Sequence, residues 1–340
     1  MENTVEMDST SSSNKTRTLG FEFKGDGMEY FKIWIVNVLL SILTLGIYSA
    51  WAKVRTNRYF YSNLYLDDSN FRYLAAPLTI LKGRIIAVVA FIIYSIVSAI
   101  LPILGMIMIV ALLFAIPYFV NQSMAFNNRM TSYKNIQFRF SASYGQAFMV
   151  IYVWPILGML SLGILYPMAL LKMHEYLVKN SAYGTTNFDF NATYKEYGMI
   201  FLAMIGVLLA VGLPIWGLIT MVPALALISP IVITVVYIGL ILFSIVKINN
   251  LYFGSINLVD HRFEANLSIG SLGLVMLINL LLTIVTLGLY LPAAKVRMTK
   301  YFSSRIVMHA TDSLDNFAAA EKESISALGE EFGQVFDFGI

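Results

Sequence analysis

Hydrophobic residues in this chain collect into seven long runs separated by shorter polar segments. A membrane hydrocarbon core about 30 Å thick is crossed by about 20 helical residues, and each run is close to that length. Within the runs, Asp, Glu, Lys, Arg and His are confined to Arg84, at the first position of the second run. The pattern predicts an all-α polytopic integral membrane protein of about seven transmembrane helices, covering residues 33–52, 84–101, 103–120, 148–169, 199–218, 226–246 and 271–291. The second and third runs are separated only by a proline-containing turn, so their helices are predicted to form a hairpin.

One segment of the chain occurs three times. Residues 37–60 recur as residues 279–302 with 14 of 24 positions identical, and a weaker copy covers residues 157–176. Repeats at this spacing within apolar runs are typical of membrane proteins built by duplication. A unit of three helices crosses the membrane an odd number of times, so successive units are expected in opposite orientation. The predicted units contain three, three and one transmembrane helices (3+3+1) and cover residues of about 21–137, 138–262 and 263–305.

Phenylalanines mark the same repeat outside the apolar runs. At an offset of 117, Phe21 aligns with Phe138, and Phe71 aligns with Phe188. At an offset of 242, Phe21 aligns with Phe263. Each unit is therefore expected to begin with a short Phe-containing polar segment, and the first two carry an Asn-Phe pair in a polar loop after their first helix.

Basic residues follow the first predicted helix of the two outer units. The middle unit instead has Leu170, Lys172 and Glu175 at the equivalent positions. Cytoplasmic loops are enriched in Lys and Arg, so this difference places the N-terminus outside and the C-terminus in the cytoplasm. The predicted cytoplasmic anchors are Lys53, Arg55, Arg58, Lys295, Arg297 and Lys300.

The composition supports a membrane protein and excludes several other classes. The chain is 58% hydrophobic and 13% charged with a mean hydropathy of +0.71, whereas about 25% of residues are charged in soluble domains. A net charge of +3, with the basic residues beside apolar runs, gives no reason to expect nucleic acid. There is no cysteine, and His174-Glu175 lacks the second histidine of a zinc-protease helix because residue 178 is valine. No catalytic set can be assembled, so the chain is predicted not to be an enzyme and to use no cofactor or metal.

The two ends of the chain differ from the apolar middle. Residues 1–18 have no compact hydrophobic region or cleavage site, so they are interpreted as a disordered tail rather than a signal peptide. The membrane domain is predicted to cover residues 19–305. Residues 306–340 are acidic and carry hydrophobic residues at roughly helical spacing. A cytoplasmic helix packed on the membrane domain and a partner-binding helix are both consistent with this pattern.

Four polar residues inside the predicted helices form the candidate site. Asn37 and Asn279 are the only asparagines in the apolar runs, and they align in the repeat. Thr44 and Thr286 lie seven residues further on, within about 20° of the same helix face. A substrate would approach this cluster from the cytoplasm past the basic anchors. Two interpretations stay open: hydrogen bonds that hold helices together, or a polar pathway.

A longer set of residues resembles a known family. The pattern Phe-X-Phe-X-Gly-X-Gly-X-X-Tyr-Phe over residues 21–31, the Thr-Leu-Gly-Ile-Tyr-Ser-Ala-Trp stretch over 44–51 and the Lys82-Gly83-Arg84 group are similar to the YjgN-like family. These are bacterial inner-membrane proteins with a domain of unknown function. The resemblance covers residues of about 20–305 and implies a location in the bacterial cytoplasmic (inner) membrane. It supplies no catalytic or ligand-binding residues.

The expected function is a transporter or channel for a small molecule or a lipid, without an intramembrane carboxylate relay because the spans contain no Asp or Glu. The alternative is a non-catalytic membrane scaffold or envelope-maintenance protein. The expected partners are membrane lipids, an unknown small molecule or lipid, and either a protein partner or further copies of the chain.

Overall fold

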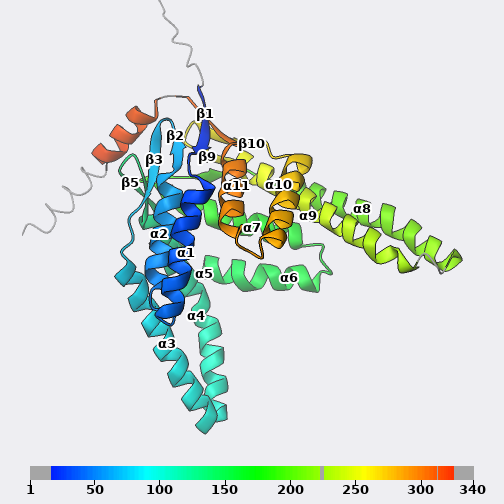
Figure 1. Cartoon of the computed structure of the whole chain (residues 1–340), viewed down its shortest axis with the longest axis horizontal. Helices are drawn as coiled ribbons and strands as arrows, with labels where there is room; N and C mark the ends of the chain where they lie inside the picture. Colours follow the sequence, from blue (N-terminus) through cyan, green and yellow to red (C-terminus); the bar gives the residue numbers. More distant parts are fainter. Residues whose placement is uncertain (1–16, 223–225, 312, 325–340) are drawn as a thin grey trace, which may run out of the picture.

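The computed structural model describes residues 17–222, 226–311 and 313–324, and it shows short strands gathered at one end with pairs of helices projecting from them (Figure 1). The helical pairs are α1 (Gly27–Leu43) with α2 (Ser49–Ser62), α3 (Pro77–Ile100) with α4 (Pro102–Arg129), α6 (Trp154–Leu160) with α7 (Tyr166–Lys179), α8 (Tyr194–Met221) with α9 (Ser229–Gly254), and α10 (Ile269–Val285) with α11 (Leu291–Ser303). A π-helical turn (Met149–Val153) joins α5 (Tyr144–Phe148) to α6. The strands are β1 (Arg17–Phe23), β2 (Leu64–Leu66), β3 (Ser69–Tyr73), β4 (Thr131–Tyr133), β5 (Ile136–Phe140), β6 (Ser181–Tyr183), β7 (Thr186–Asn187), β8 (Asp189–Phe190), β9 (Ile256–Leu258), β10 (His261–Ala265) and β11 (Ile306–Ala310).

The strands form one antiparallel sheet that nearly closes on itself. The order around the sheet is β7-β6-β5-β4-β3-β2-β1-β11-β10-β9-β8. The two outermost strands, β7 and β8, are separated in the chain by Phe188 alone, whose N–H donates to the Ser181 carbonyl oxygen at 3.0 Å. One interrupted strand therefore pairs with β6 on one side and with β9 on the other, which makes the sheet a nearly closed barrel.

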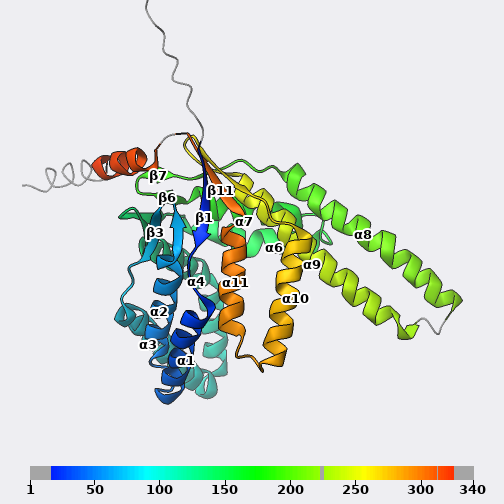
Figure 2. The ribbon, with the colours of Figure 1, turned by 45° about the horizontal axis from the view of Figure 1, so that its top comes forward.

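Five modules of the same plan make up this barrel: a strand, a pair of helices and a second strand. The two strands of each module pair with each other, as β1 with β2, β3 with β4, β5 with β6, β8 with β9, and β10 with β11. Tight turns connect successive modules, with left-handed φ values of 46° and 56° at Asp67 and Asp68 and of 45° and 66° at Lys134 and Asn135. Every helical pair therefore leaves the barrel and returns to it at the same end, as Figure 2 also shows.

This architecture corrects the predicted fold class. Within the described residues, four helices are long and apolar enough to cross a membrane: α3, α4, α8 and α9. They form the two long pairs, and the predicted hairpin between the second and third runs is confirmed at Leu101. The other three predicted spans, residues 33–52, 148–169 and 271–291, turn back before they reach the length of a span. The all-α class, the count of seven transmembrane helices and the 3+3+1 plan are therefore wrong.

The Thr-Leu-Gly-X-Tyr motif causes the reversal. Leu45 and Gly46 have φ values of 50° and 89°, a left-handed conformation that favours glycine. The side-chain oxygen of Thr44 accepts the N–H of Tyr48, the residue before the returning helix α2, at 2.9 Å and so closes the turn. The same reversal occurs at Leu162 and Gly163 (53° and 94°) and at Leu287 and Gly288 (50° and 90°). Because the turn is built from apolar residues, the hydropathy pattern does not break where the helix ends.

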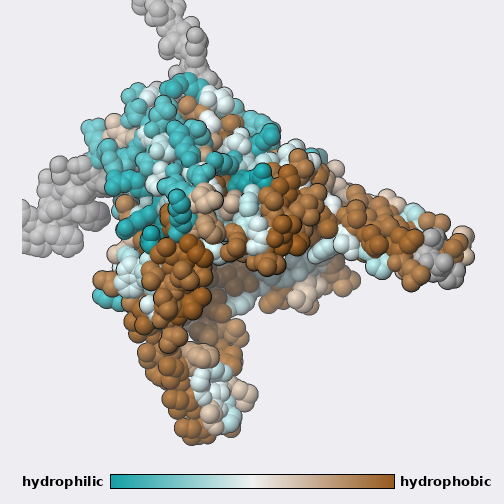
Figure 3. All heavy atoms as spheres, viewed as in Figure 1, coloured by the Kyte–Doolittle hydropathy of each residue, from teal (hydrophilic) through white to brown (hydrophobic). Residues whose placement is uncertain are grey.

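The reversing turns expose their leucines almost completely. The exposed fractions are 95% for Leu45, 95% for Leu162 and 94% for Leu287. Figure 3 shows hydrophobic residues over the projecting helical pairs and hydrophilic residues gathered on the barrel end. In a membrane, the two long pairs have the length to cross the hydrocarbon core, whereas the three short pairs present apolar tips suited to its interfacial layer.

Successive repeats have the same orientation, not opposite ones. Arg17 at the start of β1 pairs with Ala310 at the end of β11, so both ends of the barrel chain lie on one side of the membrane. The prediction of inverted units, with the N-terminus outside and the C-terminus inside, is therefore wrong. Residues 17 and 18 of the predicted tail begin β1, and the acidic segment supplies β11 and a helix over residues 314–324. The remaining parts of the two predicted tails, residues 1–16 and 325–340, lie outside the described residues.

Candidate functional site

A layer of hydrophobic side chains points into the barrel. Directly opposed residues of an antiparallel pair share one face of the sheet. The opposed pairs are Phe21 with Leu66, Phe71 with Tyr133, Phe138 with Tyr183, and Phe263 with Met308. The register of β8 with β9 continues to a fifth pair, Phe188 with Leu258. Each module thus contributes one phenylalanine and one further hydrophobic side chain to the interior.

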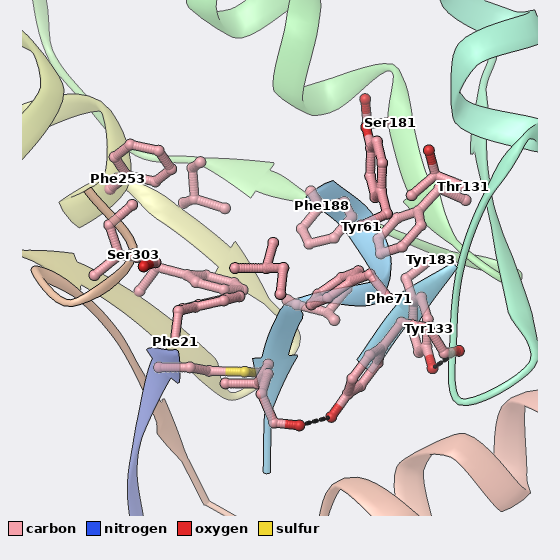
Figure 4. A pocket seen from close by; sticks show the side chains of 18 of the residues that line it. Phe21, Tyr61, Phe71, Thr131, Tyr133, Ser181, Tyr183, Phe188, Phe253 and Ser303 are labelled. Carbon is pink, nitrogen blue, oxygen red and sulfur yellow. Dashed lines mark hydrogen bonds between the residues drawn. The ribbon is translucent and has the colours of Figure 1, made fainter. Parts of the chain in front are cut away.

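The five phenylalanines form a closed ring, part of which is labelled in Figure 4. Neighbouring ring centroids are 6.3 Å apart for Phe21–Phe71, 6.4 Å for Phe71–Phe138, 6.4 Å for Phe138–Phe188, 6.5 Å for Phe188–Phe263 and 6.4 Å for Phe263–Phe21. These spacings lie within the range of about 4.5–7 Å typical of aromatic pairs. All five side chains are half-buried. We call this set the phenylalanine ring.

The partner side chains close the barrel at the end away from the helical pairs. The Tyr133 hydroxyl donates to the Leu66 carbonyl at 2.7 Å, and the Tyr183 hydroxyl donates to the Tyr133 carbonyl at 3.1 Å. Burial raises the pKa of both tyrosines, so both hydroxyls remain protonated donors. The helix over residues 314–324, which we call the cap helix, packs on this layer through Leu314 and Phe317. The Phe317 ring centroid lies 5.9 Å from that of Tyr183.

A cavity of about 780 Å³ extends from the cap helix, through the phenylalanine ring, to the barrel-side ends of α2, α4, α7, α9 and α11. This volume lies within the range of about 300–1,000 Å³ for ligand-binding sites. Its lining is mainly apolar and includes Leu and Met as well as aromatic side chains. Among the described residues that line it, Lys295 alone is charged. We call this cavity the chamber.

The predicted polar cluster lies outside the chamber lining. Asn37 Nδ2 donates to the Ala52 carbonyl at 3.5 Å, and Asn279 Nδ2 donates to the carbonyl of residue 294 at 3.4 Å. Each amide therefore bridges the two helices of its own short pair, while Thr44 and Thr286 cap the reversing turns. In the part of the chain that the structure describes, no hydrogen bond joins the first pair of polar residues to the second. The Oδ1 atoms of both asparagines are buried without a partner there. A pathway role for this cluster stays a prediction.

The six predicted basic anchors lie on α2 and α11, the returning helices of two short pairs. Arg58 donates to the Ala75 carbonyl at 3.1 Å, and Arg55 donates to the Tyr48 hydroxyl at 3.1 Å. Lys295 differs from the others because it lines the chamber. All six residues are exposed.

His174 lies on α7 beside the chamber wall. Its Nδ1 is hydrogen-bonded to the Tyr197 hydroxyl, and its ring centroid lies 4.6 Å from that of Tyr252, a chamber residue. Burial lowers the pKa of His174 to about 4. The imidazole is therefore neutral near pH 7, and it packs the interface between modules.

The sequence identifies the ring residues but not their role. The repeat offsets of 117 and 242 align three of the phenylalanines with one another and the other two with each other. Their strands are only two to seven residues long, so the alternation typical of strands is too short to recognise. The signal that was available is the recurrence of phenylalanine itself in polar segments.

Four candidate spans beside a barrel with an apolar cavity define a polytopic membrane protein. The family described as "Bacterial protein of unknown function (DUF898)" matches residues 18–335, and the chain belongs to this family. It is 31% identical over 155 residues to a protein named "Inner membrane protein YjgN" from Escherichia coli O157:H7, a match that covers 45% of this chain. It is 32% identical over 156 residues to the protein of the same name from Salmonella typhimurium, covering 46% of this chain.

The matched region spans 39% of the length of each of these two relatives. No solved structure matches the chain. The resemblance to the YjgN-like family that the sequence motifs indicated is confirmed, and the chain is a membrane protein.

Proposed function

We propose that this protein resides in the bacterial inner membrane and binds a lipid, holding the lipid's hydrocarbon chain in the chamber as a step in moving it out of the bilayer. The phenylalanine ring carries the proposal. A barrel built only for stability fills its interior with close-packed side chains. Here five aromatic side chains instead surround a cavity of about 780 Å³. A mainly apolar lining favours hydrocarbon over a polar solute.

The position of the chamber supports access from the membrane. Its lower part lies between the barrel-side ends of helices, among them α4 and α9, which are candidate spans. A hydrocarbon chain that leaves the bilayer beside these helices would therefore pass from one apolar environment into another. The described lining contains no Asp or Glu, so lipid movement would not be coupled to a carboxylate proton relay.

Cross-linking from a lipid chain tests this proposal. The full chain is placed in nanodiscs that contain a phospholipid with a diazirine on its acyl chain, and the labelled peptides are identified by mass spectrometry after irradiation. We expect labels on chamber residues such as Phe71 and Phe188 in addition to labels on the four candidate spans. The span labels serve as an internal standard for insertion into the bilayer.

A variant that narrows the chamber sharpens the test. Thr299 lines the chamber and its hydroxyl donates only within its own helix, to the Lys295 carbonyl at 2.9 Å. T299W should therefore reduce chamber labels and keep span labels. R297W on the same helix provides the matched control, because Arg297 is exposed and does not line the chamber. Labels on the spans alone in the wild type would refute lipid binding and favour a non-catalytic scaffold.

A further inference from the structure

Lys295 is the one charged residue among the described residues that line the chamber. Its Nζ lies 4.6 Å from the Phe60 ring centroid and 5.8 Å from that of Tyr30, two rings of the α1–α2 pair that border the chamber without lining it. Among the described residues, no Asp or Glu oxygen lies within 4.0 Å of this ammonium group. Lys295 is exposed overall, yet partial burial still lowers its pKa. A ligand with a negative charge would supply the missing partner.

Lys295 lies at the opposite end of the chamber from the cap helix. Helix α11 begins at Leu291 beside a reversing turn and ends at Ser303, shortly before β11. The eight residue steps from Lys295 to Ser303 correspond to about 12 Å of helix. Lys295 is therefore on the membrane side of the chamber, about one helical turn from the start of α11 at Leu291. The phenylalanine ring is on the barrel side, beyond Ser303.

We propose that the chamber binds an anionic amphiphile, with its phosphate or carboxylate group on Lys295 and its hydrocarbon chain inside the phenylalanine ring. This inference rests on the proposed function and adds the chemical class of the ligand. The chamber carries its positive charge at the Lys295 end and is uncharged at the phenylalanine ring, which matches a molecule with a charged headgroup and an apolar chain. A charged headgroup pairs with the ammonium group by a charge-assisted hydrogen bond, and the chain ends against Leu314 and Phe317 of the cap helix.

The repeat supplies a matched control. Lys53 aligns with Lys295 at an offset of 242 and occupies the same place on α2 that Lys295 has on α11. Both lysines are exposed, but Lys53 does not line the chamber. Replacement of either lysine with methionine removes the charge but retains an unbranched apolar stem of similar reach.

The experiment compares three labelled lipids in phosphatidylcholine nanodiscs. Each lipid carries the same diazirine-labelled chain, on phosphatidylglycerol, on a free fatty acid or on phosphatidylcholine. For the wild type we expect stronger chamber labelling by the anionic lipids than by phosphatidylcholine. The first two arms distinguish a phosphate from a carboxylate headgroup.

In K295M, we expect chamber labelling by the preferred anionic lipid to fall about three- to ten-fold. This range lies between the loss expected for an exposed ion pair and the loss expected for a desolvated one. K53M and K295R should label like the wild type. Unchanged phosphatidylcholine labelling in K295M shows that the chamber remains folded. If K295M retains the anionic preference of the wild type, the headgroup site is wrong although lipid binding stands. If no lipid labels the wild-type chamber, the proposed function itself fails.

Discussion

One buried carboxylate joins the cap helix to the barrel, in addition to the apolar contacts of Leu314 and Phe317 and an ion pair between Lys134 and Asp315. Glu321 is 6% exposed, and its oxygens accept the Thr185 N–H at 2.6 Å, the Thr185 hydroxyl at 2.8 Å and the Thr186 hydroxyl. Gly184 in the same turn leaves room for this carboxylate, because a Cβ there would lie 2.2 Å from Glu321 Oε2. We predict that E321A detaches the cap helix while the barrel remains folded.

The size of this effect follows from the bonds that are lost. A hydrogen bond to a charged group contributes about 1.5–3 kcal/mol, and water replaces part of that when the helix lies at the surface. Removing three such bonds should lower the free energy of local opening by about 2–4 kcal/mol. At about 1.4 kcal/mol per factor of ten, amide exchange in residues 314–324 should accelerate by about 30- to 1,000-fold.

Hydrogen–deuterium exchange by mass spectrometry measures this acceleration directly. E323A is the matched control, because Glu323 lies on the same helix and is exposed. Exchange in strand β6 reports whether the barrel stays intact. If residues 314–324 exchange at the same rate in E321A and E323A, the carboxylate does not hold the cap helix.

Four further predictions follow from the structure. The pKa of His174 is about 4 in the folded state and about 6.5 in the unfolded state, so the folded state binds fewer protons between these pH values. The free energy of unfolding should therefore fall by up to about 3 kcal/mol from pH 7 to pH 4. Thermal unfolding at the two pH values should show a smaller loss for H174Q than for the wild type. Gly46→Ala places a side chain at φ 89° and should cost about 1–2 kcal/mol in thermal unfolding, whereas Gly20→Ala, with no atom within 4 Å of the new methyl group, should cost much less. The double variant Asn37→Leu/Asn279→Leu should keep the fold and the chamber labelling, because each amide donates to a carbonyl of its own hairpin; lost labelling would instead support the predicted polar cluster. Reporters active only in the cytoplasm, fused at either end of the chain, should both be active, and reporters with opposite outcomes would contradict the pairing of β1 with β11.

The sequence predicts the membrane class and the two long helical pairs because these depend on hydropathy and length. Pro77–Ile100 and Pro102–Arg129 are apolar over enough residues to be recognised without knowledge of their neighbours. For the short pairs, the same reasoning wrongly predicts transmembrane helices, because hydropathy does not reveal the reversing turns. Leu45 and Gly46 end a helix by backbone conformation, and an exposed apolar tip gives no polar interruption in the sequence.

The barrel and its chamber are harder to predict because they arise from closure of the ring. Strand β2 is three residues long, and its two chamber-lining residues, Leu64 and Leu66, are too few to define a period of two. Phe71 and Phe188 become neighbours of Phe138 only when adjacent modules pack side by side, and Phe21 meets Phe263 only when the first and last modules pair. The same limit applies to Lys295, which the sequence groups with Lys53 because the two align. Which of them lines the chamber depends on the arrangement of modules around the barrel.

Ring closure also keeps the whole barrel, and with it the chamber, on a single side of the membrane. Each helical pair leaves and re-enters the same end of the barrel, so its two strands stay on one side whether the pair crosses the membrane or only enters it. The basic residues nearest the long pairs, Lys82, Arg84 and Lys247, lie toward the barrel, and the turns at the far ends of these pairs carry no Lys or Arg. By the positive-inside rule, we predict that the barrel is cytoplasmic. In the proposed function, a lipid that reaches the chamber would therefore come from the cytoplasmic leaflet, and the chamber would withdraw its chain toward the cytoplasm rather than carry it across the bilayer.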